Sequence, residues 1–489
     1  MKKFYLTTTL PYVNAVPHLG HALEFVQADM IARGREFFFG DEVFFNTGTD
    51  EHGMKIYQRA VEEGRDPKDY ADEYAEKFRE FSEKLNMKYS AFIRTTDKHH
   101  ENAAREFWKR CEKNGDIYKA VHRGKYCVGC ETEKVDSDLQ GGRCPEHPNL
   151  EIESFDEENY FFKFSKYEKP LLELYQKHPN FVVPNFRFNE IKSFVSGGLR
   201  DFSVSRLREK MPWGIPVPGD ENHVMYVWFD ALVNYISTLG WPEDEKNFED
   251  FWGTKENPNA FQVAGTDNLR PQSAMWQAML MSAGLPNSKQ IFIHGYITGG
   301  GGIKMSKTLG NVVDPIEIIN EYGTDALRYF LLREIPPYND GDFTKERFVE
   351  TYNASLVNGI GNLASRVMKM AFSNGVSANE NEFEKNFEEF SKGDAYEKFK
   401  IYLGSYEFKK ACDVIWGLSA SMDKEINEKK PFSLVKESPN EGNKIIKELV
   451  FNLFNIGKLL YPILPTTSGQ IVSHARENRP FDIPLFPRK

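Results

Sequence analysis

Two histidines stand three positions apart soon after the first apolar run of the chain. They belong to the segment Pro17-His18-Leu19-Gly20-His21, and helical spacing begins there. At the start of a helix, unpaired backbone N–H groups and the helix dipole attract anions, and a glycine lets a phosphate or a flat ring approach the backbone. The pattern therefore makes His18, Gly20 and His21 candidates for a phosphate site. Taken alone, so short a pattern favours a capping or core histidine pair, and the context must decide.

A second group of charged residues follows four consecutive glycines at 299–302. The segment Lys304-Met305-Ser306-Lys307-Thr308 carries two ammonium groups and two hydroxyls. Glycine supplies a hinge, and paired ammonium groups neutralise charge that develops on a reacting phosphate. Lys304 and Lys307 are therefore candidate catalytic residues. The alternative is an exposed hairpin tip with solvated lysines.

Three of the five cysteines and one histidine have the spacing of a metal site. Cys127 and Cys130 form one close pair, and Cys144 with His147 forms a second pair thirteen residues later. Each pair spans one edge of a tetrahedron. Four protein ligands leave no open position, so we expect one structural Zn²⁺ per chain, on which the folding of residues 125–150 depends. Free thiols with an accidental histidine are the alternative.

Length and composition are those of an ordinary globular protein. The 489 residues leave room for about three domains, with 40% hydrophobic and 27% charged residues. A net charge of −10 argues against a general polyanion binder. No stretch approaches 18 uninterrupted apolar residues, and the first apolar run is too short for a secretion signal. We expect a cytoplasmic protein with no membrane association, in which Cys111 and Cys412 are buried.

The elements that position these groups alternate between strands and helices. β-prone runs at 4–10 and 42–47 are each followed by a residue pattern typical of helices. The same alternation of strand and helix patterns returns from 223 to 296. Such alternation predicts a doubly wound parallel sheet. Residues 116–222 are aromatic and irregular, which indicates an inserted module. Beyond Phe343 the apolar residues recur at spacings of three and four, which predicts helices.

The two phosphate motifs, in this order, resemble those of the class I aminoacyl-tRNA synthetases. The H-x-G-H signature is matched by His18 to His21, and the K-M-S-K-S/T signature by Lys304 to Thr308. Within this class the chain resembles the methionyl-tRNA synthetase family over essentially its whole length. The further segments that carry this resemblance are TTLPYVN at 8–14, TGTDEHG at 47–53, YVWFDALVNY at 226–235 and NLASR at 362–366.

The resemblance implies an α/β fold: a Rossmann-type doubly wound parallel sheet, split by a zinc-knuckle insertion and followed by an all-α anticodon-binding bundle. The expected limits are 1–115 and 223–290 for the two halves of the catalytic domain, 116–222 for the insertion, 291–343 for the KMSKS loop and tRNA-stem contact, and 344–489 for the anticodon-binding domain. The implied activity is that of an ATP-dependent methionine–tRNA ligase. Methionine reacts with ATP and Mg²⁺ to give methionyl-adenylate, and the acyl group passes to the 3′-terminal ribose of tRNA(Met), including initiator tRNA, for translation initiation and elongation.

The resemblance also assigns residues to roles. His18, His21, Lys304 and Lys307 are the implied catalytic residues, and Gly20, Gly265 and Asp267 join them in binding ATP. The implied methionine pocket consists of Leu10, Tyr12, Asp50, Trp228, Ala231, Tyr235 and Gln272, with Asp50 on the α-amino group. The resemblance assigns recognition of the anticodon to Asn362, Arg366 and Phe432. The alternatives are a helix cap for Asp267, core packing for the aromatic residues and a solvated helix pair for Asn362 and Arg366.

Two positions depart from the family pattern. Asn268 and Gln272 are polar amides where the family commonly has an aliphatic residue and a histidine near the sulfur. Gln272 can replace the histidine as a hydrogen-bond donor, but Asn268 makes the wall of the implied methionine pocket more polar. Because an apolar pocket discriminates by only about 1–3 kcal/mol per methylene, we expect the change to affect selectivity.

Three competing functions remain open at this point. One is a class I synthetase for Leu, Ile, Val or Cys, and another is a small-metabolite nucleotidyltransferase that shares H-x-G-H. The third is a non-catalytic RNA-binding paralogue, against which the intact lysines and histidines argue. The chain ends at Lys489 without the C-terminal dimerisation domain of many relatives, so we expect a monomer.

Overall fold

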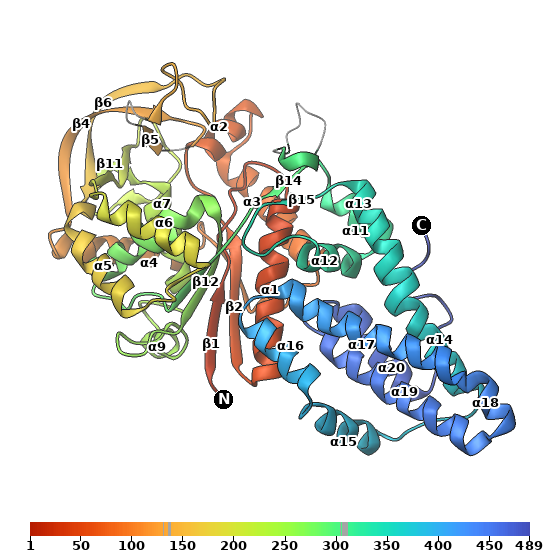
Figure 1. The fold of residues 1–489 in the computed structure, drawn as a ribbon. Helices are drawn as coiled ribbons and strands as arrows, with labels where there is room; N and C mark the ends of the chain where they lie inside the picture. Colours follow the sequence, from red (N-terminus) through yellow and green to blue (C-terminus); the bar gives the residue numbers. More distant parts are fainter. Residues whose placement is uncertain (131, 135–137, 304, 306–311) are drawn as a thin grey trace.

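A six-stranded parallel sheet forms the centre of the computed structural model, which describes residues 1–489 except 131, 135–137, 304 and 306–311 (Figure 1). Its strand order is β3-β2-β1-β12-β13-β7, and every neighbouring pair is parallel. The strands are β1 (Lys3–Thr7), β2 (Glu42–Thr49), β3 (Ala91–Arg94), β7 (Val182–Val183), β12 (Ala260–Gly265) and β13 (Gln290–His294). The sheet confirms the predicted parallel architecture, although β7 comes from within the range expected for the insertion.

Helices connect these strands. They are α1 (Leu19–Phe39), α2 (Met54–Glu62), α3 (Pro67–Lys84), α4 (Lys98–Lys113), α7 (Val227–Ala231), α8 (Asn234–Ser237), α9 (Glu245–Trp252) and α10 (Trp276–Ser282). A 3-10 turn, η3 (Thr266–Asn268), and a π-helix, η4 (Pro271–Met275), precede α10. Helix α1 is buried along most of its length and packs on β1, β2 and β12, so its first turn faces the carboxyl ends of those strands.

Two antiparallel sheets lie in the segment between α4 and α7. One sheet has the order β5-β4-β6-β8 and another the order β10-β11-β9. The strands are β4 (Ile117–Cys127), β5 (Thr132–Lys134), β6 (Glu153–Phe162), β8 (Phe202–Ser203), β9 (Ser205–Leu207), β10 (Pro216–Val217) and β11 (Asp220–Met225). A 3-10 turn, η2 (Phe164–Tyr167), and helices α5 (Glu168–Lys177) and α6 (Asn185–Ser196) complete this part.

The rest of the chain is helical after a short parallel pair, β14 (Ile297–Thr298) with β15 (Gly341–Asp342). A 3-10 turn, η5 (Gly300–Gly302), lies after β14, and a π-helix, η7 (Tyr352–Gly361), lies between α13 and α14. The helices are α11 (Pro315–Tyr322), α12 (Thr324–Arg333), α13 (Lys345–Thr351), α14 (Asn362–Ser373), α15 (Glu380–Phe390), α16 (Asp394–Gly404), α17 (Phe408–Lys429), α18 (Pro431–Glu437), α19 (Pro439–Leu460) and α20 (Pro465–Glu477).

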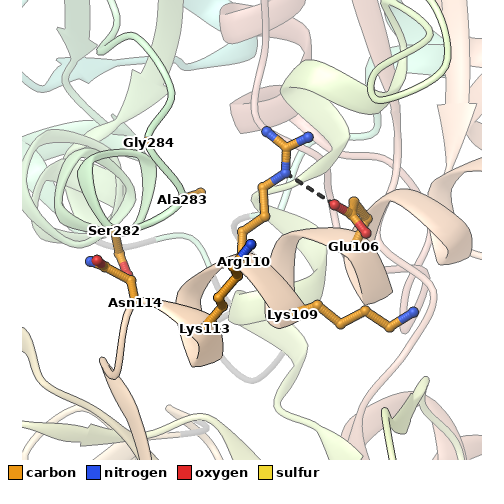
Figure 2. Close-up of a pocket in the computed structure, with 8 residues that line it drawn as sticks. All are labelled: Glu106, Lys109, Arg110, Lys113, Asn114, Ser282, Ala283 and Gly284. Carbon is orange, nitrogen blue, oxygen red and sulfur yellow. Dashed lines mark hydrogen bonds and ion pairs between the residues drawn. The ribbon is translucent and has the colours of Figure 1, made fainter.

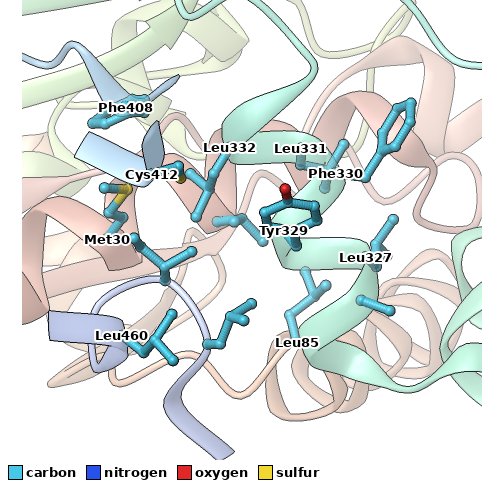
Figure 3. Close-up of a cluster of buried hydrophobic side chains, with 14 of the residues drawn as sticks. Met30, Leu85, Leu327, Tyr329, Phe330, Leu331, Leu332, Phe408, Cys412 and Leu460 are labelled. Atoms are coloured by element: carbon cyan, nitrogen blue, oxygen red, sulfur yellow. The ribbon is translucent and has the colours of Figure 1, made fainter. Parts of the chain in front are cut away.

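One apolar core joins the sheet to the helical part. Helix α12 packs against both α1 and α17, and Met30, Leu327, Cys412 and Leu460 belong to the same buried cluster (Figure 3). Cys111 and Cys412 are fully buried, as predicted. The described part of the chain contains no helix with the length and apolar character needed to cross a membrane.

Candidate active site

Those predicted ATP and methionine residues that the structure describes come from segments that meet at one edge of the parallel sheet. Strands β1 and β12 are neighbours, and the chain leaves them in opposite directions, toward β2 and toward β13. In open α/β sheets such a switch point opens a crevice at the carboxyl ends of the strands. Leu10 and Tyr12 follow β1, Asp50 follows β2, and Asp267 follows β12 at this edge.

The histidine pair caps helix α1 in a reciprocal arrangement. His18 is the N-cap, and its Nδ1 accepts a hydrogen bond from the Gly20 N–H at 3.1 Å. The His21 Nδ1 accepts from the His18 N–H at 3.2 Å, and the two rings stack with centroids 3.7 Å apart. Because both Nδ1 atoms accept from backbone donors, each neutral ring carries its proton on Nε2. The capping alternative is thus real, and it leaves two Nε2–H groups available to an anion.

Both imidazoles are neutral near pH 7. Desolvation lowers the pKa of His18, and desolvation together with the His18 charge lowers the pKa of His21 well below its ordinary value. Glycine at position 20 suits this arrangement, because a Cβ there would lie only 2.9 Å from His18 Cε1 and would crowd the ring. The pair therefore offers hydrogen bonds from neutral rings.

Gly265 and Asp267 form the opposite wall of the crevice. Gly265 ends β12, and a Cβ there would lie 2.9 Å from Asp267 Oδ1. Asp267 is exposed in the η3 turn and accepts a hydrogen bond from Asn268 Nδ2 at 3.3 Å. The arrangement leaves the Asp267 carboxylate open to a ligand with hydroxyl groups.

Sequence reasoning missed a buried pair, Glu24 and His294, behind this wall. Glu24 Oε1 accepts from the Thr9 N–H at 2.7 Å and the Thr9 hydroxyl at 2.6 Å, and Glu24 Oε2 lies 3.0 Å from His294 Nε2. His294 Nδ1 lies 2.7 Å from the Gly295 carbonyl, so both ring nitrogens face acceptors. Burial alone would lower the pKa of His294, but the bond and charge of Glu24 raise it. An acid within the apolar run after His21 was the signal available in the sequence.

The loops after β1 and β2 bring Tyr12 to Asp50. The Val13 N–H donates to the Asp50 carbonyl at 3.2 Å, and the Asp50 N–H donates to the Pro11 carbonyl at 3.0 Å. Trp228, from beyond the insertion, donates its indole N–H to the Tyr12 hydroxyl at 2.7 Å. Three predicted pocket residues from three distant segments therefore meet at one place.

The other predicted pocket residues differ in burial. Three of them are buried, Tyr235, Ala231 and Gln272, whereas Leu10 is half-buried. The Gln272 amide donates to the Tyr235 hydroxyl, and the Tyr5 hydroxyl donates to the Tyr235 carbonyl at 2.7 Å. Gln272 is thus a hydrogen-bond donor to Tyr235, and its replacement of the family histidine near the sulfur stays a prediction.

A second unpredicted network fastens the Asp50 loop to helix α7. His52 Nδ1 lies 3.0 Å from Asp230 Oδ2, and both side chains are buried. Burial alone would lower the pKa of His52, but the Asp230 carboxylate raises it. Since Asp230 lies between Trp228 and Ala231 in sequence, this pair holds two walls of the pocket together.

The predicted catalytic lysines, Lys304 and Lys307, lie outside the described residues. The described glycines before them are anchored, because the Gly301 N–H donates to Asp342 Oδ2 at 2.9 Å and the Gly302 N–H donates to Asp342 Oδ1 at 3.1 Å. Positive φ angles of 74° and 75° at Gly301 and Gly302 explain the choice of glycine there.

The four predicted metal ligands lie together, with all their donor atoms within 4.8 Å of one another. Cys130 Sγ lies 3.4 Å from Cys144 Sγ and 3.2 Å from His147 Nδ1. A tetrahedral site with Zn–S bonds of about 2.3 Å has S–S edges of about 3.8 Å, so small shifts of these side chains would bring their donor atoms to the separations that such a site requires. A Cβ at Gly129 would lie 2.4 Å from the His147 ring, so glycine is required beside the cluster. The cluster can bind a metal.

The predicted anticodon residues lie on two helices of the C-terminal part. Asn362 begins α14 and is exposed, and Arg366 on the same helix forms an ion pair with Asp423 Oδ1 at 2.8 Å. Phe432 is 51% exposed on α18. Both helices pack on α19, away from the parallel sheet (Figure 1).

An open depression of about 710 Å³ between α4 and the end of α10 lies apart from these residues (Figure 2). Its lining includes Lys109, Arg110 and Lys113, and Arg110 bonds Glu106 at 3.1 Å. No predicted site residue lines it.

Comparisons with known proteins identify the family of this chain. The family model "tRNA synthetases class I (M)" matches residues 4–153 and 148–368. The methionine–tRNA ligase of Thermotoga maritima is 40% identical over 482 residues, covering 96% of this chain and 74% of that protein. The Nostoc sp. methionine–tRNA ligase is 41% identical, covering 96% of this chain and 89% of the relative.

A solved structure, Mycobacterium tuberculosis methionyl-tRNA synthetase in complex with methionyl-adenylate, matches with a TM-score of 0.89 and 33% identity over 100% of both chains. The chain is a class I aminoacyl-tRNA synthetase in sequence and in fold. Within that class, the chain belongs to the methionine–tRNA ligase family, which confirms the resemblance seen in the motifs.

Proposed function

We propose that this chain activates methionine with ATP and transfers it to tRNA(Met), by the following division of labour among its residues. The carboxylate of methionine attacks the α-phosphate of ATP in line, which gives methionyl-adenylate and pyrophosphate. Such a step needs positioning and neutralisation of charge more than a covalent nucleophile. The convergence of the His18–His21 pair, Asp267 and the Tyr12–Trp228 pair on one crevice carries this proposal.

The phosphates lie at the first turn of α1 in this proposal. The Nε2–H groups of His18 and His21 donate to phosphate oxygens, and Gly20 leaves room for them. Lys304 and Lys307 neutralise the charge that grows on the departing pyrophosphate. Mg²⁺ bound to ATP adds to that neutralisation.

The nucleoside and the amino acid occupy the two sides of the switch point. The Asp267 carboxylate, beside Gly265, accepts hydrogen bonds from the ribose hydroxyls. The Asp50 carboxylate forms an ion pair with the α-ammonium group of methionine. Aromatic faces and edges make favourable contacts with a thioether sulfur, and Tyr12, Trp228 and Tyr235 supply them. The remaining members of the proposed methionine pocket are Leu10, Ala231 and Gln272.

We propose further that the helical part recognises the CAU anticodon. Asn362 and Arg366 lie four residues apart on one face of α14, and the exposed Phe432 ring offers a stacking surface. Arg366 exchanges its bond with Asp423 for one with a base edge. Initiator tRNA carries the same anticodon and is included among the proposed substrates.

The cysteine cluster holds one structural Zn²⁺ in this proposal, because four protein ligands leave no open position. The domain limits 1–115, 116–222, 223–290, 291–343 and 344–489 stay proposals, which limited proteolysis tests. A monomeric state and a cytosolic location are also proposed, and light scattering and cell fractionation test them.

Amino-acid-dependent ATP–pyrophosphate exchange without tRNA tests the proposed function. Twenty amino acids and homocysteine are compared, and exchange with methionine at the highest kcat/KM is expected. Preferred exchange with another amino acid would overturn the proposed pocket, and no exchange with any of them would overturn the proposed activation step.

A further inference from the structure

The residues that follow β2 form a short enclosed loop, residues 50–53, called the Asp50 loop below, which leads into α2. Asp50, Glu51 and His52 are each 4% exposed or less. Gly53 ends the loop with a φ angle of 106°, a conformation that favours glycine. Because the loop is buried, its conformation is set by the groups that bond to it.

The peptide group between Asp50 and Glu51 is held at both of its polar atoms. The Asp50 carbonyl accepts a hydrogen bond from the Val13 N–H at 3.2 Å, and the Glu51 N–H donates to Thr95 Oγ1 at 2.9 Å. Thr95 follows β3 and is fully buried. Since the peptide group is planar, bonds at both ends fix its rotation, and the backbone direction at Asp50 is fixed with it.

Trp213 holds the next part of the loop with two polar groups. Its indole N–H donates to the Glu51 carbonyl at 2.5 Å, and its own carbonyl accepts from the Gly53 N–H at 3.2 Å. Its ring lies against the His52 imidazole, with centroids 5.5 Å apart. Trp213 lies between β9 and β10, so the antiparallel segment between α4 and α7 reaches the Asp50 loop directly.

The carboxylate of Glu51, next to Asp50 in sequence, is already bonded within the protein. Arg94 Nε donates to Glu51 Oε1 at 2.6 Å, and Arg94 Nη2 donates to Oε2 at 2.8 Å. The hydroxyls of Thr49 and Thr96 donate to the same two oxygens. Glu51 therefore does not compete with Asp50 for a cationic group of a ligand.

We propose that Trp213 and Thr95 are positioning residues for the amino group of the substrate. By holding the two backbone groups of Glu51, they keep the Asp50 carboxylate aligned with the α-ammonium group of methionine. The inference rests on the ion pair in the proposed function and adds that a residue of the antiparallel segment determines its geometry. Because a charged hydrogen bond weakens as its angle departs from linearity, a small rotation of this backbone reduces methionine binding.

The α-hydroxy analogue of methionine is the probe for this inference. It keeps the carboxylate and the thioether but carries a hydroxyl in place of the α-ammonium group. The KM for methionine in ATP–pyrophosphate exchange is compared with the inhibition constant of the analogue in the same assay. Trp213→Phe keeps a ring beside His52 but has no N–H for the Glu51 carbonyl, and Thr95→Val keeps the shape of Thr95 but has no acceptor for the Glu51 N–H.

We expect the KM for methionine to rise about fivefold in each variant, the worth of one hydrogen bond. The inhibition constant of the analogue and the KM for ATP should change by less than about twofold, because neither ligand pairs with Asp50 through an ammonium group. The matched control is Trp416→Phe on α17, which removes an indole N–H that donates to the Ser355 carbonyl at 3.2 Å. The control should keep the wild-type constants.

Equal weakening of methionine and of its analogue in the folded variants would mean that Trp213 and Thr95 only support the fold. An unchanged KM for methionine would mean that Asp50 needs no such support, and either result would overturn the inference while leaving the proposed function intact. If the wild-type protein binds the analogue as tightly as methionine, the proposed ion pair of Asp50 is itself refuted. Thermal unfolding shows that a variant is folded at the assay temperature, and one folded variant is enough for the comparison.

Discussion

The indole N–H of Trp228 donates to the hydroxyl of Tyr12 at 2.7 Å, although 216 residues separate them in the chain. Tyr12 follows the first strand of the sheet, and Trp228 lies on the short helix after the antiparallel segment. The bond therefore joins two segments of the proposed methionine pocket that lie on either side of the antiparallel segment in sequence. It also orients two aromatic rings that neither segment orients alone.

Replacement of Tyr12 by Phe tests this connection. The ring stays, but the Trp228 N–H loses its acceptor in a partly buried place, which costs about 1–3 kcal/mol. We expect the KM for methionine to rise about five- to tenfold while the KM for ATP stays within twofold. Steady-state exchange kinetics measure both. Tyr402→Phe on α16 is the control, and an unchanged methionine KM in Tyr12→Phe would contradict the prediction.

The protonation state of the histidine pair predicts a flat pH profile. The pKa values of His18 and His21 lie below the ordinary 6.5, so both rings stay neutral donors as the pH falls from 8 to 6.5. In the unfolded chain both histidines keep their ordinary pKa and become protonated as the pH falls below about 6.5, whereas in the folded protein they stay neutral. Proton binding therefore favours the unfolded state, and the free energy of unfolding falls with the pH. Histidine NMR titration checks this, and ordinary titration of both rings near 6.5 would refute it.

Glu24 and His294 predict the opposite dependence. The raised pKa of His294 means that the pair stabilises the fold fully below about pH 6.5 and loses this effect as the pH rises through the folded pKa. Glu24→Gln should lower the free energy of unfolding by about 2–4 kcal/mol at pH 6 and by less at pH 9.

Urea unfolding at the two pH values measures this difference. Glu36→Gln, at an exposed carboxylate on the same helix, is the control and should change stability by less than about 1 kcal/mol. An equal loss at both pH values for Glu24→Gln would argue against a charged His294.

The contrast between these sites shows what the sequence alone can predict. Tyr12, Asp50 and Trp228 stand in motifs whose spacing is recognisable, and the alternation of strands and helices places their loops at one sheet edge. Glu24 and His294 have no local pattern, because they lie 270 residues apart in the chain and meet only once α1 has packed on the parallel sheet. Long-range pairs of single residues therefore escape sequence reasoning even where the fold is predicted correctly.

The cysteine cluster predicts a metal-dependent insertion. If the proposed zinc stabilises this small segment, Cys144→Ser should abolish zinc binding and make residues 125–150 more sensitive to proteases. Gly129→Ala should weaken metal retention, since the new Cβ would lie 2.4 Å from the His147 ring. Elemental analysis and limited proteolysis measure both effects. Cys111→Ala, a buried cysteine outside the cluster, should keep one zinc per chain; substoichiometric zinc in the wild-type protein would contradict the four-ligand site.

Arg328 on α12 is the joint between the catalytic sheet and the helical part. Its buried guanidinium pairs with Asp29 of α1 at 2.7 Å and donates to the carbonyls of Leu85, Pro462 and Ile463 at 2.9–3.1 Å. A flexible ammonium cannot reproduce this planar set of bonds, so Arg328→Lys should be destabilising and Arg328→Met more so, by about 3–5 kcal/mol.

The same joint predicts a division between the two steps of the reaction. In the proposed function, adenylate formation does not involve the anticodon end of the helical part, whereas tRNA charging needs a fixed distance between that end and the sheet edge. At a temperature where Arg328→Lys stays folded, we therefore expect tRNA aminoacylation to fall at least fivefold more than ATP–pyrophosphate exchange. Arg333→Met, at a partly exposed ion pair on the same helix, should lower neither. Equal losses in the two assays for Arg328→Lys would mean that this arginine supports the catalytic fold alone.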